Sequence, residues 1–182
     1  QGVCASYPLR RPHVECVRAT SRSFAGQALS AAIPGIDCDL ELVGEPDPGD
    51  AEVVVIALPH GMAANLAGKW RSSGRTIIDL GADFRLKDAA QYKKWYGTDH
   101  PEPALLGEAV FGLPEIAEGD LEGATLIACP GCYSTAALLA LYPAVTAGLA
   151  RPAFIVNAAS GVSGAGRALS LGYHFAGIAE DC

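Results

Sequence analysis

The stretch that decides the fold is EVVVIALPHGMAANLAGKWRSSGRTIIDL, residues 52–80. Residues 52–58 form a continuous β-branched run, which is typical of a parallel strand buried on both faces. The run stops at Pro59-His60-Gly61, residues 62–70 then have helical spacing, and residues 76–80 return to a strand pattern. A strand, a helix and a second strand in this order predict a parallel sheet with crossover helices.

The same alternation continues on both sides of this stretch. We expect further strands over 13–20, 125–129 and 154–159, and helices over 86–96 and 133–148. The fold class is therefore α/β, with a doubly wound parallel sheet. Because ligands bind such sheets at the carboxyl ends of the strands, five loops become candidates for a site. They are 21–22, 59–61, 81–85, 130–132 and 161–166.

Composition excludes several classes of protein. The chain has 182 residues, 50% hydrophobic and 18% charged, which is too apolar for a disordered chain and long enough for a complete α/β domain. Its net charge is −7, and its basic runs are only Arg10-Arg11 and Lys93-Lys94. Binding to nucleic acid needs clustered positive charge that displaces counterions from phosphate, so we expect no nucleic-acid partner.

Neither a membrane segment nor a disulfide framework is expected. Residues 123–150 carry no charge, but Pro130-Gly131 and Pro143 interrupt them, so a strand followed by a buried helix fits better than a membrane span. Residues 1–12 lack a sustained apolar stretch, so we expect no signal peptide there. Six cysteines scattered through a chain of this size suit free thiols in a reducing cytoplasm.

Cys132 is the sharpest catalytic candidate. It follows a predicted strand and a Pro-Gly turn, and a helix is expected to begin there. Unpaired amides and the helix dipole at such a position stabilise a thiolate, which can attack an activated acyl group and form a thioester. The alternative is a small buried thiol that packs under the turn, and position alone does not choose between the two.

Cys129 makes a C-x-x-C with Cys132, which allows two further interpretations. Such a pair can exchange thiols and disulfides or supply half of a zinc site. No second C-x-x-C or H-x₃₋₅-H completes a metal site, so no metal is expected. Because Cys129 ends a β-run, its side chain is expected to face the sheet and to be inert.

Three other loops carry candidate cofactor contacts. Ser21-Arg22 follows the first predicted strand, where an arginine can bind the 2′-phosphate of NADP, although a solvated surface arginine explains it equally well. The loop 161–166, GVSGAG, can approach a ligand closely but does not match the dinucleotide fingerprint. His60 either faces a cofactor or caps the following helix, and capping is favoured. Asp83 is expected to pair with Arg85 and so to fix its loop.

Seven blocks in their order resemble the N-acetyl-gamma-glutamyl-phosphate reductases of the semialdehyde dehydrogenase group. They run from about His13 to the end of the chain, so the resemblance covers most of the sequence. The blocks are ATSRSFAG (19–26), ALPHG (57–61), IDLGADFRLKD (78–88), KWYG (94–97), FGLPE (111–115), PGCY (130–133) and SGVSGAGR (160–167).

The resemblance implies an NADPH-dependent reduction of N-acetyl-gamma-glutamyl phosphate to N-acetyl-L-glutamate 5-semialdehyde, with release of inorganic phosphate, in arginine biosynthesis. By analogy, Cys132 attacks the acyl phosphate. Ser21 and Arg22 hold the adenosine 2′-phosphate, and the remaining cofactor contacts come from Pro59, His60, Ser160, Gly161 and Gly164. The full-length protein is expected to be a homo-oligomer.

The resemblance also implies a division of the chain. Residues 1–128 are expected to form a Rossmann-like NADP-binding domain without its first strand and Gly-rich loop. Residues 129–182 are expected to begin an α+β catalytic and dimerisation domain whose acid/base histidine is absent here. The family usually has Asn where this chain has Cys129, a change that allows Cys132 to be oxidised through a Cys129–Cys132 disulfide; whether that disulfide forms stays open at this point.

Three alternatives stay open at this point. The substrate can be a carrier-linked or aminoadipyl phosphate of lysine biosynthesis. The chain can be a non-catalytic fragment of the reductase, because the phosphate-binding loop and the histidine are missing. It can also act as a thiol–disulfide protein through Cys129 and Cys132.

Overall fold

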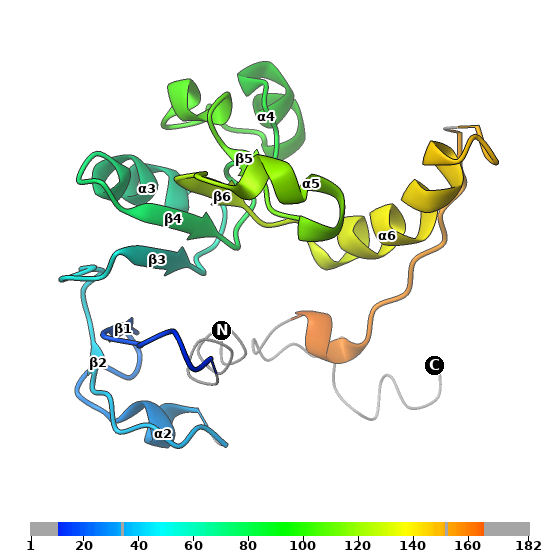
Figure 1. Cartoon of the computed structure of the whole chain (residues 1–182). Helices are drawn as coiled ribbons and strands as arrows, with labels where there is room; N and C mark the ends of the chain where they lie inside the picture. Colours follow the sequence, from blue (N-terminus) through cyan, green and yellow to red (C-terminus); the bar gives the residue numbers. More distant parts are fainter. Residues whose placement is uncertain (1–10, 34, 152, 166–182) are drawn as a thin grey trace.

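The computed structural model describes residues 11–33, 35–151 and 153–165 (Figure 1). The predicted loop 161–166 therefore ends at a residue outside the described ones, as does the last part of the predicted second domain. In chain order the elements are β1 (Ala19–Thr20), α2 (Leu29–Ala32), β2 (Leu42–Val43), β3 (Val53–Ile56), α3 (Ala63–Arg71), β4 (Thr76–Asp79), α4 (Ala89–Tyr96), η1 (Pro103–Leu106), β5 (Val110–Phe111), α5 (Pro114–Leu121), β6 (Leu126–Ala128), α6 (Cys132–Thr146) and η2 (Val162–Ala165).

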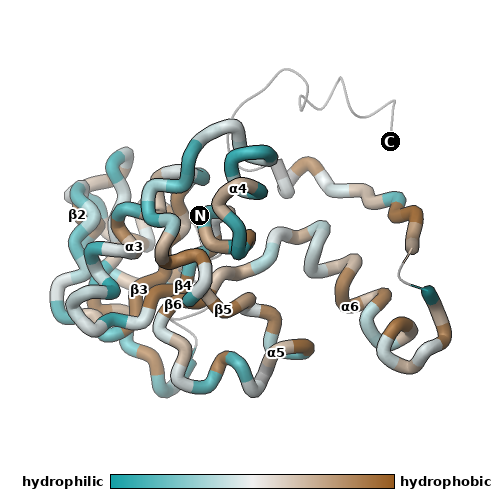
Figure 2. Tube along the Cα trace, turned by 90° about the horizontal axis from the view of Figure 1, so that it is seen from above, coloured by the Kyte–Doolittle hydropathy of each residue, from teal (hydrophilic) through white to brown (hydrophobic). Residues whose placement is uncertain are grey.

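The predicted parallel α/β fold is confirmed. Strands β3, β4, β6 and β5 form a four-stranded sheet in that order, and every neighbouring pair is parallel. Strands β1 and β2 form a separate parallel pair. Figure 2 shows α3 and α5 on opposite sides of the row of strands, as right-handed crossovers in opposite directions require.

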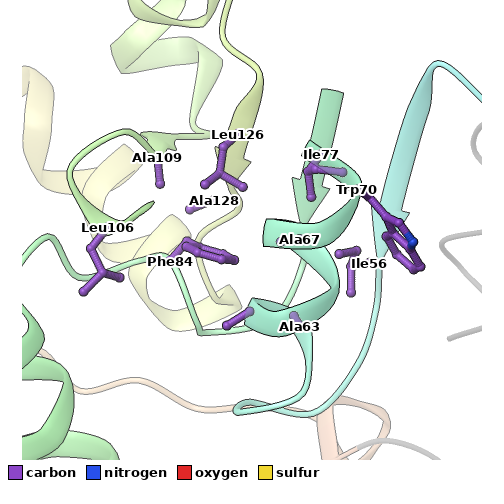
Figure 3. Close-up of a cluster of buried hydrophobic side chains, with 11 residues drawn as sticks. Ile56, Ala63, Ala67, Trp70, Ile77, Phe84, Leu106, Ala109, Leu126 and Ala128 are labelled. Atoms are coloured by element: carbon purple, nitrogen blue, oxygen red, sulfur yellow. The ribbon is translucent and has the colours of Figure 1, made fainter. Parts of the chain in front are cut away.

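The main core lies between α3 and one face of the four-stranded sheet (Figure 3). Small side chains let the helix approach the strands closely, because alanine adds little volume between the two backbones. The buried residues of this cluster are Ile56, Ala63, Ala64, Ala67, Trp70, Ile77, Phe84, Leu106, Ala109, Leu126 and Ala128. A second, smaller cluster of Leu29, Ala32 and Leu42 joins α2 to β2.

Strand β3 is buried on one face, whereas its β-branched run predicts burial on both. Ile56 is 3% exposed on the side of the core, but Val53 and Val55 are 52% and 42% exposed. The side chains of a strand alternate between the two faces of a sheet, so these two valines share the face opposite α3. Within the described residues, that face lacks a covering layer over β3.

The predictions for the first and the last strand of the sequence, 13–20 and 154–159, are largely wrong. Of the strand expected over 13–20, only Ala19–Thr20 is paired, because its partner β2 is itself only two residues long. Residues 154–159 form no strand, and Ile155 is 97% exposed. A β-branched run becomes a strand only where a neighbouring edge accepts its hydrogen bonds, and the described residues offer 154–159 none.

Helix α6 begins and ends close to the predicted bounds but is not the buried helix that its composition predicts. Its residues are CYSTAALLALYPAVT, and within the described part of the chain none of them is buried. In Figure 1 this helix extends away from the four-stranded sheet. A helix that is apolar all round is typical of the interior of a larger assembly. Leu138, Leu139 and Tyr142 are instead 37%, 39% and 41% exposed.

Candidate active site

Three of the candidate loops meet at one edge of the four-stranded sheet. Ile56 at the end of β3 pairs with Asp79 at the end of β4, and Asp79 pairs with Ala128 at the end of β6. Because these strands are parallel and end in register, the loops 59–61, 81–85 and 130–132 leave the sheet side by side. This edge is the candidate active site.

Asp83 joins the first two of these loops. Its carboxylate is completely buried and accepts hydrogen bonds from the amides of Gly61 at 2.6 Å, Ala63 at 3.0 Å and Ala64 at 3.0 Å. The N-cap residue of α3, Met62, offers no capping side chain, so Asp83 caps this helix from a distant part of the sequence. A carboxylate at the positive end of the helix is also favoured electrostatically.

Two sequence-based expectations about these loops are therefore wrong. His60 does not cap α3, because the carboxylate of Asp83 occupies that position. Asp83 does not pair with Arg85 within the described residues, because its oxygens already accept the helix amides. A cap contributed twenty positions away cannot be recognised from local spacing.

Aromatic side chains hold Asp83 from the other side. The hydroxyl of Tyr92 donates to Oδ1 of Asp83 at 3.1 Å, and burial, followed by the charge of Asp83, raises the pKa of Tyr92 to about 12. The amide of Glu102 donates to Nδ1 of His100 at 3.1 Å, so Nε2 carries the proton and donates to the carbonyl of Asp83 at 2.9 Å. The rings of Phe84 and Tyr92 meet that of His100 edge-on.

Arg85 connects the second loop to the third. Its Nε donates to the carbonyl of Cys129 at 2.7 Å, and its Nη2 donates to the carbonyl of Leu80 at 3.0 Å. A Cβ placed on Gly131 would lie 3.1 Å from Nη1, so the guanidinium lies directly beside the residue that precedes Cys132. The sequence reading assigned Arg85 a purely structural role. Arg85 closely follows the carboxyl end of a parallel strand, where ligands bind in such sheets. This position was the signal that could have indicated a role for its positive charge in the site.

Cys132 is the first residue of α6, and its side chain is exposed. Gly131 is extended (φ −76°, ψ 164°), and its carbonyl accepts the amide of Thr135 and the hydroxyl of Ser134, both at 2.9 Å. The expected helix start at this cysteine is confirmed, while its catalytic role stays a prediction. Cys129 and Cys132 are not joined by a disulfide.

The remaining predicted contacts near this edge are Pro59 and His60, which are both exposed. The ring of His60 lies 5.4 Å from that of Tyr96 of α4, at an interplanar angle of 36°. Gly61 has φ +79°, a backbone conformation that a side chain would strain. The loop is therefore held between the Asp83 carboxylate and the rings of α4.

Ser21 and Arg22 follow β1 in the separate two-stranded sheet. The amide of Ser21 donates to the carbonyl of Val43 at 2.9 Å and so extends the parallel ladder. Arg22 is exposed, and within the described residues its guanidinium has no partner. No strand pairing among the described residues joins this sheet to the other.

Ser160, Gly161 and Gly164 make local contacts. The amide of Gly164 donates to the carbonyl of Gly161 at 2.9 Å, and the hydroxyl of Ser160 donates to the same carbonyl at 3.3 Å. All three are exposed. Among the described hydrogen bonds none links them to the edge that carries Cys132, so their role in binding a cofactor stays a prediction.

None of the helices among the described residues combines the length and the apolar character needed to cross a bilayer. The same residues contain no group of three or more His, Cys, Asp or Glu side chains able to hold a metal ion.

Comparison with known proteins identifies relatives over nearly the whole chain. Proteins named N-acetyl-gamma-glutamyl-phosphate reductase from Dehalococcoides mccartyi (strain CBDB1) and Desulforudis audaxviator are each 45% identical to it, over 93% and 94% of this chain. One from Pseudomonas entomophila is also 45% identical, over 94% of the chain. These matches cover 50%, 51% and 52% of the relatives, so the chain spans about half their length.

Two family models match consecutive parts of the chain. The semialdehyde dehydrogenase NAD-binding domain matches residues 9–124, which include β3, β4 and β5 of the four-stranded sheet and the loops 59–61 and 81–85. The semialdehyde dehydrogenase dimerisation domain matches residues 132–182, beginning at Cys132. With its Rossmann-like parallel α/β fold, the chain belongs to the semialdehyde dehydrogenase family.

Proposed function

We propose that this chain carries the cofactor-binding and cysteine-bearing part of an NADPH-dependent N-acetyl-gamma-glutamyl-phosphate reductase. The reaction would convert N-acetyl-gamma-glutamyl phosphate to N-acetyl-L-glutamate 5-semialdehyde with release of phosphate, as a step of arginine biosynthesis. The names of the relatives support the choice of substrate. The observation that carries the proposal is the exposed thiol of Cys132 at the start of α6, directly after Gly131, against which the guanidinium of Arg85 lies.

In this proposal Cys132 acts as the nucleophile. Its sulfur attacks the acyl carbon, a bond forms between sulfur and carbon, and the bond from that carbon to the phosphate oxygen breaks. Inorganic phosphate leaves, and Cys132 retains the acyl group as a thioester. The amides at the start of α6 and the guanidinium of Arg85 provide positive charge close to the developing anions.

The residues present fit a nicotinamide cofactor with a 2′-phosphate. Arg22 follows the carboxyl end of a parallel strand, is exposed, and has no partner for its guanidinium in the described part of the chain. Ser21 and Arg22 would hold the phosphate, and the loop of Pro59 and His60, with Ser160, Gly161 and Gly164, would line the rest of the site. When bound, NADPH would supply the hydride that reduces the thioester carbon to the aldehyde, while the bond from that carbon to the sulfur of Cys132 breaks and frees the thiolate.

The cofactor assignment has a direct test. Calorimetry with the 182-residue chain should detect NADPH binding, and Arg22→Ala should weaken it by about tenfold because a charged contact to the 2′-phosphate is lost. NADH, which lacks that phosphate, is the matched control and should bind both forms equally. If Arg22→Ala weakens the binding of NADPH and NADH equally, the role of Arg22 in holding the 2′-phosphate is contradicted.

The catalytic assignment is tested by single-turnover phosphate release. The chain mixed with N-acetyl-gamma-glutamyl phosphate should release one equivalent of phosphate in a burst, and Cys132→Ser should abolish the burst. Cys16→Ser is the control and should retain it. A burst that survives in Cys132→Ser would overturn the proposal, and a faster burst with a carrier-linked or aminoadipyl phosphate would reassign the substrate to lysine biosynthesis.

We also propose the division of the chain near residue 129 and a homo-oligomeric full-length protein in the cytoplasm. Support for the division comes from the two matched ranges, 9–124 and 132–182, and support for oligomerisation from the description of the second as a dimerisation domain. The exposed apolar surface of α6 and of residues 154–156 would then face other parts of the assembly. Sedimentation of the full-length protein tests this directly.

A further inference from the structure

Tyr96, the last residue of α4, makes a ring contact that the proposed function does not use. Its ring centroid lies 5.4 Å from that of His60, with 36° between the two planes. Aromatic rings attract one another when their centroids are about 4.5–7 Å apart. His60 is exposed, and among the described residues its imidazole makes this ring contact and no hydrogen bond. The contact with Tyr96 therefore sets where the imidazole points.

Tyr96 is itself held by a row of aromatic rings that begins in the interior. Its ring lies 4.8 Å from that of Tyr92, which is fully buried and stands four positions earlier on the same face of α4. The ring of Tyr92 meets the buried His100 edge-on at 4.7 Å. Because buried side chains in such a row have little room to move, the row gives Tyr96 a fixed position beside the exposed His60.

The same face of α4 holds the backbone of this loop by a second, separate route. The hydroxyl of Tyr92 donates to Oδ1 of Asp83 at 3.1 Å, and that oxygen also accepts the amide of Gly61 at 2.6 Å. The backbone of the loop is thus fixed through Asp83, whereas the side chain of His60 is fixed through Tyr96. Removing the ring of Tyr96 should free the imidazole and leave the backbone in place.

The ends of α4 place Tyr96 at the edge of the site. The carboxylate of Asp88 accepts the amide of Gln91 and caps the start of the helix. The helix ends after Tyr96 at Gly97, whose φ is +77° and whose amide donates to the carbonyl of Lys93 at 2.9 Å. Tyr96 is half-buried, and its hydroxyl makes no hydrogen bond with any described residue. Its contribution is therefore that of the ring.

We propose that Tyr96 is a positioning residue that holds the imidazole of His60 in place for the nicotinamide cofactor. This inference rests on the proposed function, which places His60 in the cofactor site. An imidazole that is already held loses less conformational freedom when a ligand binds. Since Tyr96 acts on His60 and not on the loop of Ser21 and Arg22, its effect should be the same for NADPH and NADH.

The first test is nuclear magnetic resonance of the 182-residue chain without cofactor, at one fixed pH. The imidazole protons of His60 are assigned by their loss in His60→Gln. Tyr96→Leu should move these resonances towards the positions of a free histidine, because the ring current of the tyrosine is lost, and Tyr96→Phe should leave them in place. Unchanged resonances in Tyr96→Leu would overturn the proposal. Equal displacement of the His100 resonances would indicate general support of the fold and would overturn it too.

The second test is calorimetry with both nicotinamide cofactors. Tyr96→Leu should weaken the binding of NADPH and NADH alike, by about two- to tenfold, and Tyr96→Phe should stay within about twofold of the wild type. Trp95→Leu is the matched control, because the neighbouring Trp95 is 69% exposed and should leave both affinities unchanged. Equal losses for Tyr96→Leu and Trp95→Leu would contradict the role of Tyr96.

A double variant tests whether the effect passes through His60. In a His60→Ala background, Tyr96→Leu should change either affinity by less than about twofold, because its partner is already gone. A full loss that persists in this background would show that Tyr96 acts by another route and would overturn the proposal.

Failure of this inference and failure of the proposed function can be told apart. If the wild-type chain does not bind NADPH, the proposed function fails, whatever the His60 resonances show. If the wild-type chain binds NADPH and Tyr96→Leu binds it equally well, only the positioning role of Tyr96 fails.

Discussion

Asp83 and Ala64 lie 19 positions apart in the sequence, yet Oδ2 of Asp83 accepts the amide of Ala64 at 3.0 Å. This contact, with those to Gly61 and Ala63, makes Asp83 the cap of α3 and fixes the loop after β3 to the loop after β4. The carboxylate of Asp83 also accepts a hydrogen bond from the hydroxyl of Tyr92. The candidate active site therefore depends on a buried polar network as well as on the parallel sheet.

Removing the Asp83 carboxylate should destabilise the fold strongly. Asp83→Ala leaves three amides at the start of α3 and the hydroxyl of Tyr92 without their acceptor, and we expect a loss of about 3 kcal/mol in the free energy of unfolding. Urea unfolding followed by circular dichroism measures the change. Asp99→Ala is the control, because the side chain of Asp99 is 81% exposed in its pair with Lys93, and it should change stability by less than about 0.5 kcal/mol. A loss no larger for Asp83→Ala than for Asp99→Ala would contradict the capping role.

Tyr92→Phe tests one hydrogen bond of that network. It removes the donor to Asp83 while keeping the buried ring, so we expect a loss of about 1 kcal/mol at pH 7. Because the pKa of Tyr92 is raised to about 12 from an ordinary value of 10, the folded chain retains this proton above pH 10. The stabilisation is fully present below pH 10 and is lost as the pH rises towards 12, so the deficit of the variant should shrink over that range. If Tyr92→Phe is still about 1 kcal/mol less stable than the wild type at pH 11.5, the raised pKa of Tyr92 is contradicted.

Asp79→Asn should stabilise the chain at neutral pH. The folded pKa of about 6 exceeds the ordinary value of 3.8, so between these values the folded state binds more protons than the unfolded state. Wild-type stability therefore falls as the pH rises from about 4 to 6, whereas the variant has no such group. We expect equal stability at pH 4 and an advantage approaching about 3 kcal/mol for the variant at pH 7. Urea unfolding at pH 4 and pH 7 measures the two free energies of unfolding. A difference between variant and wild type that is the same at both pH values would contradict the raised pKa of Asp79.

Charging the exposed apolar segment should reduce self-association. Ile155 is 97% exposed next to Val156 at 52%, which leaves apolar surface that another copy of the chain can cover. We expect Ile155→Asp to lower the fraction of oligomer in sedimentation velocity at about 50 μM without loss of stability. Asn157→Asp introduces the same charge two positions away and should have a smaller effect. Equal effects of the two variants would show that charge alone is responsible.

Local patterns predicted much of the fold. The runs that form β3, β4 and β6 were predicted correctly as strands, because each has a neighbouring strand that completes its hydrogen bonds. The start of α6 at Cys132 was likewise predictable, since a Pro-Gly turn before an apolar run ends one element and begins another. The short strand β5 was missed because two paired residues carry too little periodicity to detect. The helix α5 was also missed, since its helical backbone is interrupted at Ala117 and the run on either side is short.

What the sequence by itself determined is the alternation of strands and helices, the parallel sheet, and the cysteine at the start of a helix, because these depend on neighbours within a few positions. Only the tertiary structure decided that Asp83 rather than His60 caps α3, and that Arg85 reaches the carbonyl of Cys129. It also decided that residues 154–159 have no strand partner among the described residues. Hydrogen-bond partners 20 or 44 positions apart are chosen by the register of the strands, which local spacing does not encode.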